Sequence, residues 1–232
     1  MKKIAFFVEG QTEQLFVEHL LCEVATKNCL EVEKTTSQGR RGRRAISLKA
    51  SSSPSKGHTH YALVVDCGSD SSVSSDILEN YDSLAQTFDA IVGVRDVYPS
   101  FLRTDIPKLR RLAGYGLKTK PIEVTHVLAT MEIESWFIAE HTHFLRLHHG
   151  LSVDAIRTAT GVDPSGNVEE IDAPADRLDA IYQVVGFRYR KKKTTVQRTL
   201  STLDFAEVYL GLPSRVPSLA LLTSAITTFL TP

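Results

Sequence analysis

The sequence contains few cysteines and no long apolar run, so it lacks the features of disulfide-rich folds and of membrane spans. Its 232 residues include three cysteines, Cys22, Cys29 and Cys67, an odd number without metal-type spacing. We therefore expect reduced thiols in a cytoplasmic protein. No stretch approaches the roughly 20 apolar residues that span a bilayer, and the apolar run at residues 4–8 is too short for the core of a signal peptide. The sequence thus predicts a protein without a membrane segment.

The chain also lacks net charge and a phosphate-cradling loop. It has 27 basic and 27 acidic residues, so its overall charge indicates no partner. No Gly-x4-Gly-Lys-Ser/Thr motif occurs, so ATP hydrolysis would have to come from a partner protein. The histidine pairs at 58/60, 141/143 and 148/149 lack the cysteine and histidine spacing of zinc sites. We interpret them as surface or helix-end residues.

Apolar runs alternate with helical patterns along the first 150 residues. Strands are expected at 4–8, 31–33, 61–66, 90–96 and 122–128, and helices at 12–26, 76–87, 106–112 and 132–147. This alternation predicts an α/β domain with a mostly parallel sheet and helices on both faces. Residues 35–57 are expected to form a mobile basic loop. After residue 151 only helical patterns remain, at 154–160, 175–185, 194–210 and 219–230, which predicts a helical carboxyl-terminal subdomain over 151–232.

Three of the apolar runs end on acids, namely Glu9, Asp66 and Asp96. Neighbouring strands lie about 4.8 Å apart, so carboxylates at adjacent strand ends can share an ion. Oxygen ligands alone suit Mg²⁺ or Mn²⁺ better than Zn²⁺. The alternative is that each acid caps the helix that follows it. The pattern indicates a divalent-metal site but does not separate it from this alternative.

Several short motifs resemble the TOPRIM family of topoisomerases, primases, OLD-type nucleases and an rRNA-maturing ribonuclease. The segment Glu-Gly-Gln-Thr-Glu at 9–13, between an apolar run and a helical pattern, is similar to the first TOPRIM motif. The acidic, Trp-containing segment 129–140 and the tail from 189 through the helical pattern to 204 resemble small bacterial TOPRIM-like proteins, which often pair with an ATPase in defence loci. The resemblance covers most of the chain and implies a TOPRIM/Rossmann-like fold.

The resemblance also implies roles for individual residues. Glu9 would be a metal ligand or general acid–base, and Glu13 would support it from the first helical turn. The family's Asp-x-Asp motif corresponds to residues 94–96, where Val94 replaces the first acid and Asp96 is retained. Asp66, with nearby Asp70, would supply the missing charge, unless Asp70 simply begins a helix. The site would hold two metals, one or none.

Glu132 and Glu134 are further candidate metal ligands. On a continuous helix they would point about 200° apart, with Glu132 nearer the apolar stripe of Trp136 and Phe137. If the helix begins later, both can face the same cleft. The alternative role for either is an acid favoured in a first helical turn.

Basic residues cluster in two segments, which are candidates for holding a nucleic-acid backbone. The first contains Arg40, Arg41, Arg43 and Arg44, and the second contains Arg190, Lys191 and Lys192, followed by Lys193. OLD-type nucleases resemble this arrangement in using a lysine beyond the acidic motifs, which would be Lys193, with Lys191 as second choice. Its role would be a phosphate clamp or transition-state cation. The alternative is an exposed basic turn.

These observations lead to three hypotheses. The first is a Mg²⁺- or Mn²⁺-dependent phosphodiesterase, a nuclease acting on DNA or RNA, with an ATPase partner and a role in phage defence. The second, motivated by Val94, is a TOPRIM-like subunit that binds nucleic acid or a partner without catalysis. The third is a phosphatase for small phosphoesters, which would need no extended basic surface. Oligomeric state is not indicated by the sequence.

Overall fold

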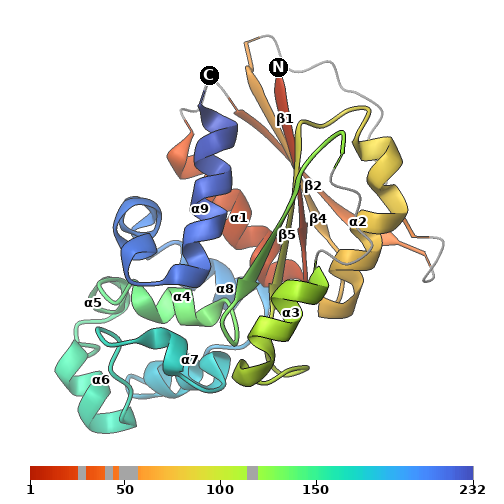
Figure 1. Ribbon diagram of the computed structural model, residues 1–232. Coiled ribbons are helices and arrows are strands. Elements are labelled where there is room, and N and C mark those ends of the chain that lie inside the picture. The colour runs from red at the N-terminus through yellow and green to blue at the C-terminus, as the bar shows by residue number, and fades with distance from the viewer. Residues whose placement is uncertain (26–29, 40–43, 47–56, 114–119, 232) are drawn as a thin grey trace. The chain divides into compact units, whose positions relative to one another are not determined.

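The structure is a computed structural model that describes residues 1–25, 30–39, 44–46, 57–113 and 120–231 (Figure 1). The chain forms two compact units. The first contains Met1–Arg95, Pro107–Leu128 and Leu221–Pro232, and the second contains Asp96–Ile106 and Ala129–Ala220. The units are therefore not consecutive stretches. The helices that follow residue 151 are divided between them, with most in the second unit and the greater part of the last helix in the first.

The first unit is built on a six-stranded sheet. Its strands are β1 (Lys2–Val8), β2 (Leu30–Gln38), β3 (Ala45–Ile46), β4 (His60–Asp66), β5 (Ala90–Asp96) and β6 (Val124–Ala129), in the order β3-β2-β4-β1-β5-β6. β1 pairs in parallel with β4 and β5, and β2 pairs in parallel with β4, whereas β2 and β3 are antiparallel. The central residues of strands β1, β4 and β5 are buried, as expected for parallel strands covered on both faces.

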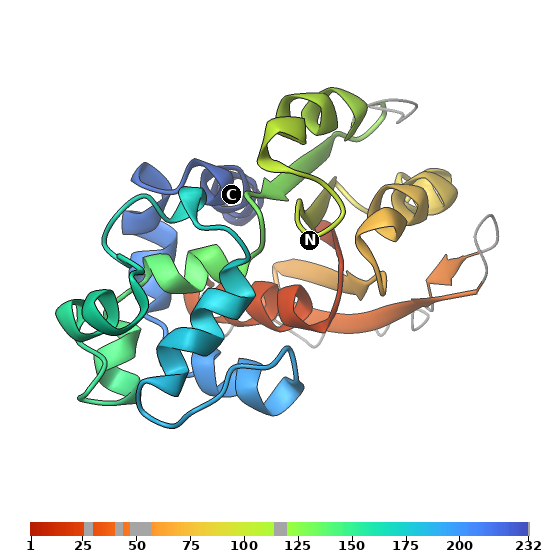
Figure 2. The ribbon, with the colours of Figure 1, turned by 90° about the horizontal axis from the view of Figure 1, so that it is seen from below.

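Helices cover both faces of this sheet. Ala5 and Phe7 of β1 pack in one core cluster with Val73, Ile77 and Tyr81 of α2 (Asp70–Leu84). Because side chains alternate along a strand, Ile4, Phe6 and Val8 point to the other face. There α1 (Gln11–Val24) lies opposite α2 (Figures 1 and 2), and the Gln14 side-chain amide donates to the carbonyl of Val64 on β4. The first unit also contains α3 (Ile106–Ala113) from Pro107 onward and the last helix from Leu221 onward.

The second unit is helical. It contains α4 (Glu134–Ala139), α5 (His143–Leu147), α6 (Val153–Thr160), α7 (Pro174–Gln183), α8 (Lys193–Leu200) and the first residues of α9 (Pro217–Leu230). Short non-α turns occupy Arg103–Asp105, Val168–Glu170, Glu207–Gly211 and Leu212–Ser214. The core contains fully buried Trp136, Phe144 and Tyr182, and the Trp136 indole donates to the Ser218 hydroxyl at 2.8 Å.

The α/β class and the mostly parallel sheet expected from the sequence are confirmed. Two expected helices are interrupted. The helix expected at 132–147 is divided at Glu140, whose backbone (φ −78°, ψ 65°) leaves the helical region. The helix expected at 194–210 ends at Leu200 and is followed by a separate turn at Glu207–Gly211.

Within the loop expected at 35–57, residues 35–38 belong to β2 and 45–46 to β3, while 40–43 and 47–56 lie outside the described residues. No helix among the described residues combines the length and apolarity needed to cross a bilayer.

Candidate metal centre

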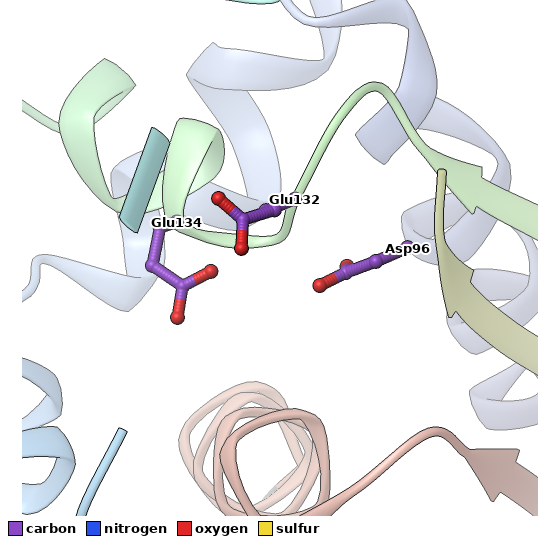
Figure 3. A group of neighbouring side chains, drawn as sticks. All are labelled: Asp96, Glu132 and Glu134. Carbon is purple, nitrogen blue, oxygen red and sulfur yellow. The ribbon is translucent and has the colours of Figure 1, made fainter. Parts of the chain in front are cut away.

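Three acids of the second unit point into one space (Figure 3). Asp96 is the last residue of β5, Glu132 precedes α4, and Glu134 is its first residue. One carboxylate oxygen from each lies within 4.8 Å of the others, and all three residues are buried. This is the only group of three or more acid, histidine or cysteine ligands that meets this distance within the described part of the chain.

The turn between β6 and α4 places both glutamates in this cluster. Met131 has φ of 67°, a left-handed conformation that is uncommon for a residue with a side chain. The Ile133 amide then donates to Oδ1 of Asp96 at 2.9 Å. Because α4 begins only at Glu134, Glu132 lies outside the helix and the 200° separation does not apply. Of the two arrangements expected from the sequence, the structure has the one in which the helix begins late and both acids face the same cleft.

Backbone and hydroxyl donors hold the two glutamates. The Tyr189 hydroxyl donates to Oε1 of Glu134 at 2.8 Å, and the amide of Ala175, near the start of α7, donates to Oε2 of Glu132 at 2.9 Å. Such bonds fix the direction of a carboxylate, and the bond from Tyr189 also favours the charged form of Glu134. Oε2 of Glu134 is buried and accepts no hydrogen bond.

Lys191 brings a positive charge to the cluster. Its Nζ lies 3.0 Å from Oε1 of Glu132, 3.3 Å from Oε2 of Glu134 and 3.6 Å from Oδ2 of Asp96. The carboxylates are nearly inaccessible, whereas 41% of the Lys191 side chain is exposed. The cation therefore reaches buried acids from a position in contact with solvent.

Burial raises the pKa of the Glu134 carboxyl above its ordinary value. The Lys191 ammonium opposes this increase, Glu132 adds to it, and the hydrogen bond from Tyr189 also opposes it. A carboxyl in this position binds a proton more readily than an exposed glutamate, unless a further cation neutralises the cluster.

A pocket of about 280 Å³ adjoins the carboxylates. Glu132 and Lys191 line both the pocket and the cluster, so the two are continuous. The other lining residues are aromatic, acidic or basic side chains and one alanine: Tyr98, Ala175, Asp176, Asp179, Tyr189 and Arg190. The Asp179 carboxylate is bound by the Arg188 guanidinium at 2.8 and 3.0 Å. The pocket therefore combines aromatic surface with charge of both signs.

The other predicted acids belong to the first unit. Glu9 follows β1, and Asp66 ends the adjacent parallel strand β4, paired in register with Val8. Asp66 accepts a hydrogen bond from the Gly68 amide at 2.8 Å, and burial raises its pKa. Glu13 is buried in the first turn of α1. Within the described part of this unit these three acids do not form a second three-ligand group. Their roles in metal binding stay predictions.

Of the first basic segment, Arg40, Arg41 and Arg43 lie outside the described residues. The Arg44 guanidinium is 2.7 Å from the carboxylate of fully buried Asp76 and donates to the Cys67 carbonyl at 2.6 Å. These contacts give Arg44 a structural role in the first unit, and its predicted role in nucleic-acid binding is untested.

In the second basic segment, Arg190, Lys192 and Lys193 are exposed, and Lys193 begins α8. Lys191, which the sequence favours less than Lys193, is the lysine that pairs with the acids. The sequence does not indicate that Tyr189 and the Ala175 amide hold the two glutamates. No sequence signal identifies such contacts, because they depend on how distant helices pack.

Comparison of the chain with protein-family models, curated proteins and solved structures found no match.

Proposed function

We propose that Asp96, Glu132 and Glu134 bind Mg²⁺ or Mn²⁺ and that the protein hydrolyses phosphodiester bonds in nucleic acid. The observation that carries the proposal is the convergence of three buried carboxylates within 4.8 Å. A single ammonium cannot balance three carboxylate charges, and unbalanced buried charge is costly. The donor set is oxygen alone, which suits these ions, and Oε2 of Glu134 is buried without a hydrogen bond.

The bound ion and the residues around the cluster would have different roles. A bound ion would polarise a phosphate oxygen and lower the pKa of a bound water. Tyr189 and the Ala175 amide would keep the glutamates oriented as ligands. Arg190 and Lys191 line the adjoining pocket, where they would face the phosphate, and exposed Lys192 and Lys193 would extend a positive surface along the backbone.

A TOPRIM-like identity, a partner ATPase and a role in phage defence are further parts of this proposal. They rest on the motif resemblance alone. In that scheme Glu9 and Glu13 would contribute to the chemistry, and the partner would supply the ATP hydrolysis for which this sequence has no loop.

Cleavage assays on the full chain test the proposal. Labelled single-stranded DNA, duplex DNA and RNA are incubated with Mg²⁺, Mn²⁺ or EDTA, together with wild type, Glu9→Gln, Glu132→Gln or Glu134→Gln. We expect metal-dependent cleavage that falls at least about 100-fold in the Glu132 and Glu134 variants. Glu170→Gln, which changes an exposed acid of the same unit, should retain activity. Full activity in Glu134→Gln would overturn the proposal, whereas full activity in Glu9→Gln would remove only Glu9 from the chemistry.

One observation favours a second candidate, a binding subunit without catalysis. Lys191 lies within ion-pair distance of all three carboxylates, so the cluster already contains an internal cation. This candidate predicts nucleic-acid binding that weakens with salt but is unaffected by EDTA. Turnover that requires Mg²⁺ or Mn²⁺ would exclude it. Turnover of p-nitrophenyl phosphate without cleavage of nucleic acid would instead identify a small-phosphoester phosphatase.

A further inference from the structure

Lys191 is positioned where a metal ion would compete with it. Its Nζ is 3.0–3.6 Å from an oxygen of each of the three carboxylates. A cation that accepts ligands from all three acids must come close to the same carboxylate oxygens. Two cations that share these oxygens repel each other strongly at such distances.

The position of Lys191 in the chain allows it to leave. It lies between α7 and α8, outside both helices, and its side chain is partly exposed. The carboxylates, in contrast, are held by the Ile133 amide, the Ala175 amide and the Tyr189 hydroxyl. The acids are therefore held by the fold, whereas the lysine side chain reaches them from solvent.

The pocket gives the displaced ammonium a destination. It has a volume of about 280 Å³, adjoins the cluster at Glu132, and is lined by Lys191 itself. Asp176 of α7 brings negative charge to the lining, whereas Asp179 is already paired with Arg188, and Arg190 adds a positive charge. A lysine that turns into this pocket remains hydrated and close to compensating charge.

We propose that Lys191 is an exchangeable counter-ion: it neutralises the carboxylate cluster in the metal-free protein and moves into the adjoining pocket when a divalent cation binds. This inference rests on the proposed metal site. Its consequence is that metal binding delivers a positive charge to the place where an anionic phosphoester would enter. The same lysine thus links occupancy of the metal site to recognition of the substrate.

The effect of removing Lys191 on metal affinity distinguishes two roles. Removal of a residue that helps to hold a metal weakens metal binding, whereas removal of a competing cation strengthens it. For Lys191→Met we expect a Kd for Mn²⁺ about tenfold lower than in wild type, within the usual range of coupling between two ligands. The metal-free variant should also melt at a lower temperature, because its carboxylates lose their counter-ion, and Mn²⁺ should raise its melting temperature more than that of wild type.

Mn²⁺ titration by calorimetry and thermal melting on the full chain provide the test. Lys191→Arg retains a competing positive charge and should bind Mn²⁺ with a Kd close to wild type. Lys192→Met removes the neighbouring exposed charge and should change the Kd by no more than about twofold, because exposed charges are screened. Lys191→Gln provides a second uncharged variant if Lys191→Met does not fold.

The outcomes separate this inference from the function on which it rests. If wild type binds Mn²⁺ and both uncharged variants bind it equally or more weakly, the exchange is overturned while the metal site stands. If neither wild type nor the uncharged variants bind Mn²⁺, the proposed metal site itself fails. If only the uncharged variants bind it, the exchange is supported, and Lys191 holds the site in a metal-free state.

Discussion

The hydroxyl of Tyr189 donates a 2.8 Å hydrogen bond to Oε1 of Glu134, and both side chains are buried. The bond stabilises the carboxylate form of an acid whose pKa burial raises. It therefore joins the segment before α8 to the first residue of α4, and it adds to the opposition of Lys191 to the increase in the pKa of Glu134.

Tyr189→Phe should weaken metal binding. Without the hydroxyl, the pKa of Glu134 increases further and a proton competes more strongly with the ion. We expect the Kd for Mn²⁺ to rise about tenfold at neutral pH, with a smaller difference at pH 8 than at pH 6. Calorimetry at several pH values measures this. Tyr209→Phe removes a hydroxyl elsewhere in the unit and should leave the Kd unchanged; a pH-independent effect in Tyr189→Phe would argue against the mechanism.

Glu134→Gln should stabilise the metal-free protein at neutral and alkaline pH. Because the folded-state pKa of Glu134 is raised, its contribution to stability is present below the ordinary glutamate value and is lost as pH rises through the raised value. The amide imitates the protonated acid and removes this loss. The free energy of unfolding, measured by urea denaturation in EDTA, should favour the variant at pH 8 and converge with wild type near pH 4. Glu170→Gln, at an exposed acid, should show no such divergence.

Buried His143 should make the second unit sensitive to acid. Burial lowers its pKa from 6.5 to about 4, so the unfolded chain binds the proton first as the pH falls. Stability is therefore lost as pH decreases from about 6.5 towards 4, by up to about 3 kcal/mol, since one pKa unit corresponds to about 1.4 kcal/mol. Urea denaturation across this range should show a shallower slope for His143→Gln than for wild type. The exposed His149, changed in the same way, should retain the wild-type slope.

Arg44→Met should destabilise the first unit. The substitution leaves the Asp76 carboxylate, which is 0% exposed, without the guanidinium at 2.7 Å, and loss of one partner from a buried pair costs about 3–5 kcal/mol. Asp76→Asn added to Arg44→Met should recover much of this loss, as measured by urea denaturation. The double variant then tests nucleic-acid binding without the folding defect. Equal stability of Arg44→Met and wild type would show that the ion pair is unimportant.

The sheet could be predicted because its strands are buried on both sides. Residues 4–8, 61–66 and 90–96 are continuous apolar runs followed by helical patterns, and each lies in an observed strand. The short strand expected at 31–33 extends over Leu30–Gln38, because its polar residues through Thr36 pair with β4 and Ser37 and Gln38 pair with β3. Hydrophobic patterning does not mark such a strand.

The candidate site could be predicted only in part. Asp96, Glu132 and Glu134 were among the expected metal ligands, and Lys191 among the basic candidates. The choice between Lys191 and Lys193 depends on where α8 begins, and the convergence of Glu132 with Glu134 depends on the left-handed backbone of Met131. Both are set by tertiary packing, which no local spacing rule contains.

The bonds that shape the cluster join residues far apart in the sequence. Ile133 and Asp96 are separated by 37 residues, Ala175 and Glu132 by 43, and Tyr189 and Glu134 by 55. Each bond closes a long loop, and the entropy of closure must be overcome before the contact stabilises the chain. Contacts of this range generally form slowly. The carboxylate cluster therefore exists only once these separate segments have come together, so its assembly, followed in time, reports on the formation of the native second unit.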